Sequence, residues 1–387
     1  MAAPLSDVDL LARLVAFDST SRHSNLPIAD FICDYFARPA FLVHHNYNDD
    51  KSKVNLVIEL RGKKSRVDDG DGLTLCGHMD VVPANEPDWR TDPFRLAEYD
   101  DRLVARGACD MKGFVALAMN ALRSVETQSL SRSLALLLTF DEELGTLGAQ
   151  HFVRTWPQPH GLPRRMIVGE PTSLRVARMH KGHLKLRITT NGRAAHSGYP
   201  ALGVNAIEPM GRVLVALSEL RARFAAERPA NGQFFPEAPF VVVNPALLRG
   251  GVAINVIPDR CELDLGIRVL PGMRSSDIVQ AVRDMVNEIP GVGADSVSIL
   301  GDSPPLLTDE SNELVQILCD LLQQSESLGM SYATDAGPLA SMGFDCVLWG
   351  PGSIDVAHKP NEWLPKNEFV RASNLLDTMI HRFCGHD

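Results

Sequence analysis

The residues best suited to chemistry are carboxylates and imidazoles, each of which follows an apolar stretch or lies in a glycine-rich turn. His78 and Asp80 stand two positions apart at the end of the apolar run Leu73 to Gly77, so in an extended strand their side chains share one face. Such a pair is typical of a metal ligand and the group that orients it. The other members of the set are Asp110, Glu142, Glu143, Glu170 and His358. Together they are what a hydrolase with two metal ions requires.

Two divalent cations at a catalytic site take imidazole nitrogen and carboxylate oxygen as ligands and keep a position for water. His78 and His358 supply the nitrogens. A carboxylate must also bridge the cations, which lie about 3.5 to 4 Å apart. We predict Asp110 for this role, because the glycines in Gly107-Ala108-Cys109-Asp110-Met111-Lys112-Gly113 let the backbone turn tightly. Glu170 is predicted to complete the ligands, and the expected metal is zinc, with cobalt as the alternative.

Glu142 and Glu143 directly follow the apolar run Leu134 to Phe140. Neighbouring side chains in an extended chain point to opposite sides, so the two carboxylates cannot comfortably bind one metal. One is therefore expected to bind a metal, and the other to take a proton from water and deliver it to the leaving amine. The residues alone do not decide which glutamate has which role.

Each of these features has a structural alternative when it is taken alone. A His-x-Asp pair is commonly a hydrogen-bonded surface or core pair, and two glutamates before a helix commonly interact with its dipole. Asp110 could be a turn residue, and Glu170 could simply end a strand. Structural explanations at all of these places together are improbable. A non-catalytic metal-binding protein would also commonly lack a ligand or the base, whereas every position is filled here.

The elements that must position these residues alternate between short β-rich runs and helical patterns, which predicts an α/β fold with a mostly parallel sheet. From about Gly182 the order becomes β-α-β-β-α-β, a ferredoxin-like unit that is complete in itself. The alternation of strand and helix patterns returns after Pro304 and Pro305. We therefore predict a discontinuous catalytic domain, residues 1–180 and 302–387, with an inserted domain, residues 181–301.

Composition excludes several other classes of function. The 387 residues carry 38 Lys and Arg against 48 Asp and Glu, a net charge of -10, so nucleic acid is not an expected partner. No apolar run approaches the roughly 20 residues of a membrane span, and charged residues interrupt the N-terminal leucines, unlike a signal peptide. Seven scattered cysteines without a CxxC spacing indicate reduced thiols and a cytoplasmic protein.

The motifs around these residues resemble those of the two-metal amidohydrolases, the family that includes acetylornithine deacetylase, succinyl-diaminopimelate desuccinylase and carboxypeptidase G. The resemblance runs from about Leu10 to the C-terminus. It is carried by Gly77-His78-Met79-Asp80-Val81-Val82-Pro83, Gly107 to Gly113, Asp141-Glu142-Glu143 and Gly169-Glu170-Pro171-Thr172. Within the family the chain is most similar to the acetylornithine deacetylases, through His180-Lys181-Gly182-His183, Gly203 to Glu208, Arg268 to Met273 and Gly350 to Ile354 leading to Ala357-His358.

The resemblance implies specific roles for these residues. One metal would be held by His78, Asp110 and Glu170, and the other by Asp110, Glu143 and His358. Glu142 would be the general acid and base, and Asp80 the partner of His78.

The inserted domain would then be a lid that also forms a homodimer. From it His196 would stabilise the oxyanion, in its own or a partner's site, while Asn255 and Arg268 would bind the acyl carbonyl and the α-carboxylate of the substrate. Where the deacetylases tend to carry Thr-Glu-Ala, this chain has Thr334-Asp335-Ala336. Asp335 is therefore a candidate to bind the substrate's amino tail, and its side chain is one methylene shorter than that of glutamate.

The implied reaction is removal of the acetyl group from N2-acetyl-L-ornithine, a small N-acyl amino acid, as in arginine biosynthesis. The alternatives within the class are a succinyl-diaminopimelate desuccinylase and a broad N-acyl-amino-acid hydrolase. The alternative outside the class is the non-catalytic metal-binding protein considered above.

Overall fold

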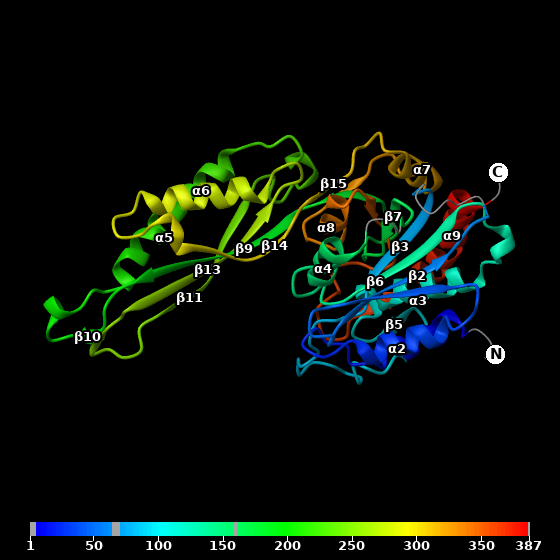
Figure 1. The fold of residues 1–387 in the computed structure, drawn as a ribbon, viewed down its shortest axis with the longest axis horizontal. Helices are drawn as coiled ribbons and strands as arrows, with labels where there is room; N and C mark the ends of the chain where they lie inside the picture. Colours follow the sequence, from blue (N-terminus) through cyan, green and yellow to red (C-terminus); the bar gives the residue numbers. More distant parts are fainter. Residues whose placement is uncertain (1–4, 64–69, 158–160, 386–387) are drawn as a thin grey trace. The chain divides into compact units, whose positions relative to one another are not determined.

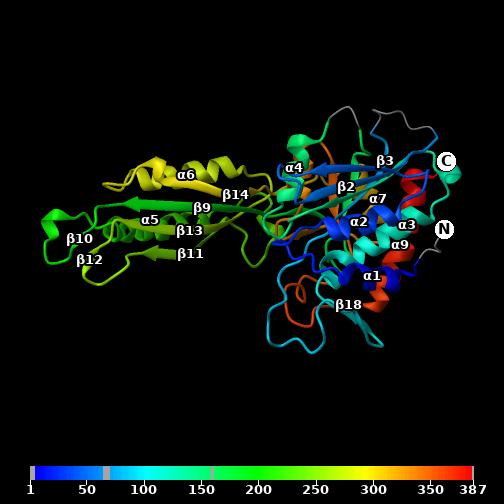
Figure 2. The ribbon, with the colours of Figure 1, turned by 60° about the horizontal axis from the view of Figure 1, so that its bottom comes forward.

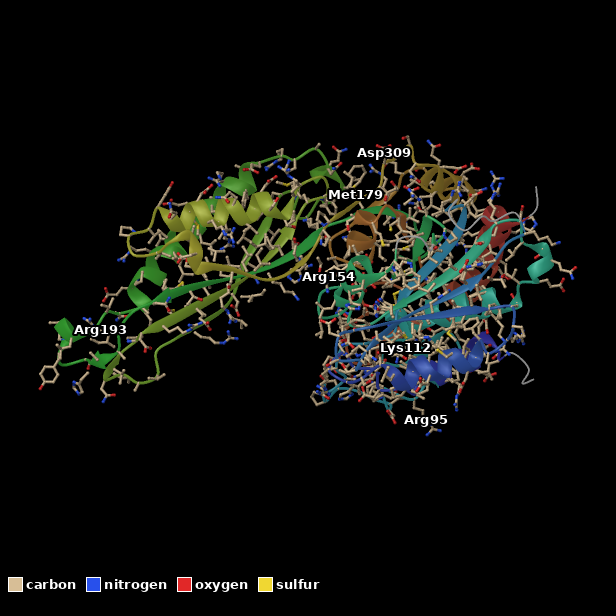
Figure 3. All side chains as sticks on the ribbon, in the orientation of Figure 1. Arg95, Lys112, Arg154, Met179, Arg193 and Asp309 are labelled. Carbon is tan, nitrogen blue, oxygen red and sulfur yellow. The ribbon has the colours of Figure 1, made fainter. Side chains whose placement is uncertain are left out.

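The chain forms two compact units. The structure, a computed structural model, describes residues 5–63, 70–157 and 161–385. Unit 1 consists of Met1–Arg178, Thr308–Leu328 and Thr334–Asp387, and unit 2 consists of Met179–Leu307 and Gly329–Ala333. Met179 and Asp309, both labelled in Figure 3, lie beside the points where the chain leaves unit 1 and returns to it.

A mixed sheet forms the centre of unit 1. In the described residues its strand order is β1-β2-β6-β3-β7-β17-β8-β15. The four central strands β6, β3, β7 and β17 are parallel, whereas the flanking pairs are antiparallel. The predicted α/β fold is confirmed, and its parallel part is the centre of the sheet. The bounds of these strands are β1 Leu42–Tyr47, β2 Val54–Leu60, β3 Gly72–His78, β6 Ser133–Thr139, β7 Arg165–Val168, β8 Ala177–His180, β15 Leu306–Leu307 and β17 Asp345–Leu348, with β16 Leu328–Met330 beside β8.

Helices cover both faces of this sheet. One face presents alternate residues of the central strands, among them Leu75, Leu136 and Ile167, to a core shared with several helices. These helices are α1 Asp7–Val15, α2 Leu26–Tyr35, α3 Gly113–Ser124, α7 Glu313–Leu321 and α9 Lys366–Cys384. Figure 2 shows α1, α3 and α9 next to one another. In Figure 1, α4 Leu147–Thr155 and α8 Ala336–Ser341 lie beside each other, and they contact β2 and β17 respectively.

The ends of several elements follow from local chemistry. Ser6 caps α1, because its side chain accepts a hydrogen bond from the amide of Asp9. Asn312 caps α7 in the same way. A small three-stranded sheet, β4 Ala97–Glu98, β5 Arg102–Val104 and β18 Trp363–Pro365, joins segments that lie far apart in the sequence. It leads directly into η1 Ala108–Lys112, which carries Asp110.

Unit 2 contains the predicted β-α-β-β-α-β order. It consists of β9 Gly182–Asn191, α5 Ile207–Ala226, β11 Val242–Gly250, β13 Arg260–Val269, α6 Ser275–Asn287 and β14 Val297–Ser303. The strands pair antiparallel in the order β11-β13-β9-β14, which is the ferredoxin-like arrangement. Alternate residues of β9 and β13 are buried under the two helices. A separate ribbon of β10 Ala195–His196 and β12 Val256–Ile257 extends this unit (Figure 2).

Within the described part of the chain, none of the helices combines the length and apolar character needed to cross a membrane. That a lid function belongs to unit 2 stays a prediction.

Candidate metal centre

The carboxyl ends of the four parallel strands meet at one edge of the sheet in unit 1. β3 ends at His78, β6 at Thr139, β7 at Val168 and β17 at Leu348. The loops that follow these strands carry the remaining polar residues, Glu142, Glu143, Glu170 and His358. Ligand sites of open α/β sheets form at this edge, because all of these loops emerge on the same side.

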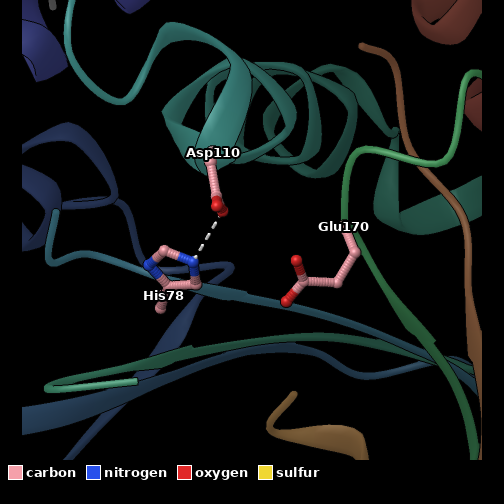
Figure 4. A group of neighbouring side chains, drawn as sticks. All are labelled: His78, Asp110 and Glu170. Atoms are coloured by element: carbon pink, nitrogen blue, oxygen red, sulfur yellow. Dashed lines mark hydrogen bonds and ion pairs between the residues drawn. The ribbon is translucent and has the colours of Figure 1, made fainter. Parts of the chain in front are cut away.

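The first group of side chains consists of His78, Asp110 and Glu170. One possible ligand atom from each lies within 4.8 Å of the others. The Nε2 atom of His78 is 3.1 Å from Oδ1 of Asp110. Figure 4 shows the Glu170 side chain extending toward this pair from the end of its strand. All three residues are buried, so a cation held here would be shielded from bulk water.

The second group consists of Asp110, Glu143 and His358, again with one ligand atom each within 4.8 Å. Nε2 of His358 lies 3.1 Å from Oδ2 of Asp110 and 3.0 Å from Oε2 of Glu143. Asp110 therefore directs one carboxylate oxygen to each group. This is the arrangement that a carboxylate bridging two metal ions requires.

The chemistry of these donors fits divalent cations. Burial raises the pKa values of Glu142 and Glu170 well above that of an exposed glutamate, and neighbouring carboxylates add to the effect. Among the residues that the structure describes, the buried Oε1 atom of Glu170 has no hydrogen-bond partner, which is unusual for a carboxylate in a protein interior. Cations would supply the missing partner and neutralise the like charges.

Glu142 lies in a tightly held turn directly after β6. Its backbone amide donates to Oδ1 of Asp80 at 3.1 Å, and the amide of Glu143 donates to Oδ2 at 3.3 Å. Asp141, just before them, adopts a left-handed conformation with φ 50°, and its carboxylate pairs with the buried ammonium of Lys53. The turn is thus fixed at both ends, while the raised pKa of the Glu142 carboxyl suits a group that accepts and returns a proton.

Asp80 contacts His78 in a different way from the one its spacing predicts. Nδ1 of His78 lies 2.9 Å from the backbone carbonyl oxygen of Asp80 but 3.7 Å from the nearest carboxylate oxygen. The Asp80 carboxylate instead accepts hydrogen bonds from the Glu142 and Glu143 amides and from the Ser21 hydroxyl. Asp80 thereby orients the imidazole through its backbone and the two glutamates through its side chain.

Asp335 is buried rather than open to a ligand. It precedes α8, it is 1% exposed, and its Oδ2 atom accepts a hydrogen bond from Thr139 Oγ1. Burial raises the pKa of this carboxyl to about 7. Asp335 lies on the same unit as both groups of ligands, and that it meets the amino tail of a substrate stays a prediction.

The three candidates in unit 2 do not come together. His196 pairs with Val256 in the β10–β12 ribbon, and the carbonyl oxygen of Asn255 accepts from the amide of Ser197 at 2.9 Å, so His196 and Asn255 are neighbours on an exposed ribbon. Arg268 lies near the opposite end of β13, where it pairs with His183. Arg260 begins β13 shortly after the ribbon strand β12, and the eight residue-to-residue steps from Arg260 to Arg268 span about 26 Å of strand.

Sequence reasoning missed Arg106 and Glu362, two buried charged residues that contact the Asp110 turn. Both oxygens of Glu362 are occupied, Oε1 by the amides of Cys109 and Asp110 and Oε2 by the Arg106 guanidinium. The sequence does contain a signal that points to these two residues. Arg106 interrupts the apolar run Leu103 to Ala105 directly before the Gly107 turn, and Glu362 follows His358 by four residues.

We expect the stabilisation that metal gives to grow as the pH rises. In the metal-free protein, burial raises the pKa of Glu143 to about 6 and that of Asp335 to about 7, so the folded state loses stability as the pH rises through these values. Hydrogen bonds to Asp110 and Glu143 raise the pKa of His358 to about 10. The contribution of His358 to the stability of the folded state is complete below the pKa of an unfolded histidine, about 6.5. It is lost as the pH approaches about 10.

Metal binding has the opposite dependence, because the ligands must be deprotonated. With free cation at about 100 times its dissociation constant, each site adds about 2.7 kcal/mol to the free energy of unfolding. The gap in Tm between metal-loaded and chelated protein should therefore widen between about pH 6 and about pH 9. Thermal unfolding in the two states measures it, and a gap independent of pH would contradict the assignment of these side chains as ligands.

Comparison with known proteins identifies the family. A model of the peptidase family M20/M25/M40 matches residues 74–382. The acetylornithine deacetylase of Myxococcus xanthus is 35% identical over 382 residues, which cover 97% of this chain and 97% of that protein. The acetylornithine deacetylase of Klebsiella pneumoniae strain 342 is 33% identical over an alignment of 393 positions, which covers 98% of each chain. The chain belongs to the peptidase family M20/M25/M40. The predicted class, a metal-dependent amide hydrolase, is confirmed.

Solved structures share the fold. The M20 family metallo-carboxypeptidase Sso-CP2 of Sulfolobus solfataricus matches with a TM-score of 0.77 and 16% identity, covering 97% of this chain and 98% of that one. A dinuclear metal binding peptidase of the M20 family from Bacillus subtilis matches with a TM-score of 0.68 and 13% identity, covering 97% of each chain. At these identities the likeness concerns the fold alone.

Proposed function

We propose that this protein hydrolyses N2-acetyl-L-ornithine to L-ornithine and acetate. The observation that carries the hydrolytic part is Asp110, whose two oxygens face two groups that each contain one histidine and one glutamate. The relatives that are named acetylornithine deacetylase and align over nearly the whole chain support the choice of substrate.

In this proposal His78, Asp110 and Glu170 hold one cation, and Asp110, Glu143 and His358 hold the other. Bound divalent cations supply polarisation of the amide carbonyl and water whose pKa falls toward about 7. Glu142 takes the proton from the attacking water and returns it to the departing amine. Asp80 keeps Glu142 in place through the amide hydrogen bond described above. Arg268 binds the α-carboxylate of the substrate, for which a guanidinium has matching bidentate geometry, and Asn255 binds the acyl carbonyl.

Zinc is the proposed metal, with cobalt as the alternative, because both suit mixed nitrogen and oxygen ligands. The scattered cysteines without a CxxC spacing support a cytoplasmic enzyme, and the relatives named acetylornithine deacetylase support a place in arginine biosynthesis.

The substrate assignment is tested with a panel of N-acyl amino acids. Protein that has been chelated and then reloaded with Zn²⁺ or Co²⁺ is assayed for release of the free amine from acetylornithine, acetylmethionine and succinyl-diaminopimelate. We expect kcat/KM to be highest for acetylornithine by at least about tenfold, equivalent to about 1.4 kcal/mol of transition-state binding. A preference for either other substrate would replace the assignment, and no turnover of any would favour a non-catalytic protein.

We further infer that the active form is a homodimer through unit 2. Exposed apolar residues surround the β10–β12 ribbon, with Val252 at 91% and Ile254 at 103% exposure, and Tyr199, Leu202 and Val204 beside them. Such a patch is typical of a protein interface. Because His196 and Asn255 lie far from Arg268 within one unit 2, a second copy of the chain that supplies His196 and Asn255 would let all three act on one small substrate. There His196 would stabilise the oxyanion.

The Ile254→Lys variant is expected to shift the protein from dimer to monomer, since it puts a charge into the apolar patch. Sedimentation velocity measures the change, and kcat should fall by about 10²-fold if the oxyanion donor comes from the partner. Val370→Lys, the same kind of change at an apolar residue of unit 1 that is 60% exposed, is the control and should leave the dimer intact. A wild-type protein that sediments as a monomer would refute the dimer.

A further inference from the structure

A buried ion pair, Arg106 with Glu362, lies behind the Asp110 turn. Arg106 is 0% and Glu362 is 1% exposed, and Nη1 of the arginine donates to Oε2 of the glutamate at 2.8 Å. Neither residue belongs to the two groups of ligands. Removing one partner of such a buried pair is strongly destabilising. Among the described residues the Nε atom of Arg106 has no hydrogen-bond partner, and the contacts of the other polar atoms show what the pair holds.

Glu362 holds the backbone of Asp110. Its Oε1 atom accepts the amide of Cys109 at 2.9 Å and the amide of Asp110 at 3.1 Å. The backbone carbonyl of Glu362 accepts from Ala105 at 3.1 Å as well. The segment that carries the bridging carboxylate is therefore fixed on both sides of the Gly107 turn by one residue.

Arg106 connects this residue to two further segments. Its Nη2 atom donates to the carbonyl of Pro83 at 3.1 Å and to Glu86 at 3.0 Å, in the loop that follows His78. Its Nη1 atom also reaches the carbonyl of Lys359 at 3.4 Å, next to His358. The guanidinium stacks over Trp89 with 5.2 Å to the ring centroid, which restricts its orientation.

We propose that Arg106 and Glu362 are positioning residues for the cation held by Asp110, Glu143 and His358. The pair sets the distance between Asp110 and His358, because Glu362 fixes the backbone of the first and Arg106 contacts the residue beside the second. His78 and Glu170 depend on it less, since they stand at the ends of β3 and β7, whose sheet pairing already positions them. The inference rests on the proposed two-metal function.

The test measures the dissociation constants of both cations in Arg106→Lys and Glu362→Gln. Lysine keeps the positive charge but lacks the planar guanidinium whose several N–H groups join the segments. Glutamine keeps an oxygen that can accept from the amides of Cys109 and Asp110. Titration of the chelated, folded protein with Co²⁺ is followed by its absorption bands, and the bands of the cation next to His358 are assigned from their loss in His358→Ala. That cation should bind about 10- to 100-fold more weakly, as for other residues that support ligands. The other cation should change by no more than about threefold.

Activity provides a second measurement. At saturating Co²⁺ both variants should regain kcat to within about tenfold of wild type, because the reacting groups are unchanged and only metal affinity is lost. Asp71→Asn is the matched control. It removes a charge partner of Arg132 and Arg165 near the amino end of β3, the edge of the sheet away from the ligands. It should lower Tm without changing either dissociation constant.

The outcomes separate the inference from the function on which it rests. A lower Tm with both dissociation constants unchanged, or equal weakening of the two cations, would overturn the positioning role. If Glu362→Gln does not fold, Arg106→Lys decides alone by the same criteria. A wild-type protein that binds fewer than two cations would instead refute the two-metal function.

Discussion

The Glu142→Gln variant is expected to turn over acetylornithine about 10²- to 10⁴-fold more slowly than the wild-type protein, the range typical for loss of a general acid and base. Both cations should stay bound, because Glu142 belongs to neither group of ligands. Glutamine has the same size and leaves the backbone hydrogen bond to Asp80 in place, but it cannot carry the proton. The measurements are kcat at saturating substrate and the metal content after dialysis.

Glu126→Gln supplies the matched control for this experiment. It makes the same chemical change at an exposed residue just beyond the far end of α3, about 18 Å of helix away from the Asp110 turn, and should keep full activity. Normal turnover by Glu142→Gln would remove this residue from the mechanism. Loss of metal together with activity would instead identify Glu142 as a ligand.

The Asp110→Asn variant should lose both cations and all measurable activity. Asp110 is the residue that the two groups share, so one substitution removes a charged ligand from each. We expect both dissociation constants to rise by more than about 100-fold, beyond the 10- to 100-fold that supporting residues usually cost. Equilibrium dialysis with elemental analysis measures the bound metal.

His358→Ala is the comparison that gives this result its meaning, since His358 belongs to only one group. It should leave about one cation bound per chain, the one next to His78. If Asp110→Asn also retained one tightly bound cation, Asp110 would be a ligand of a single metal and the bridging assignment would be wrong.

Much of the fold could be predicted because its long elements follow simple periodicities. The apolar runs that became β2, β3 and β6 are buried along almost their whole length, as expected for strands covered on both faces. The strand β11 runs from Val242 to Gly250, and its second half could not be predicted. Beyond Asn244 most of its residues are exposed, so the alternation that marks a half-buried strand is lost.

Other parts of the fold depend on contacts that no local pattern contains. β18 pairs with β5 across about 260 residues of sequence, and each of these strands has only three residues. The antiparallel pairing at the flanks of the large sheet likewise depends on the direction in which each connection brings the chain back to the sheet. A short strand of this kind is stabilised by its partner rather than by its own sequence.

The candidate site divides in the same way. Each ligand candidate except Asp110 follows a parallel strand, and this rule alone gathers them at one edge. The rule does not reveal how the supporting residues act. The Asp80 carboxylate accepts hydrogen bonds from the glutamate amides and lies 3.7 Å from the imidazole, and Asp335 faces Thr139 inside the protein. These contacts depend on side-chain geometry between residues that lie 62 and 196 positions apart in the sequence.

The insertion of unit 2 into unit 1 also has a consequence for biosynthesis on the ribosome. The core of unit 2 is drawn from one uninterrupted stretch, Leu184 to Val297, whereas the groups around Asp110 need residues from His78 to His358. Because domains generally fold as units while the chain is still growing, the inserted unit can be finished while its host is still incomplete. The group that contains His358 therefore cannot be complete until late in synthesis, whereas all residues of the group that contains His78 leave the ribosome before unit 2 does.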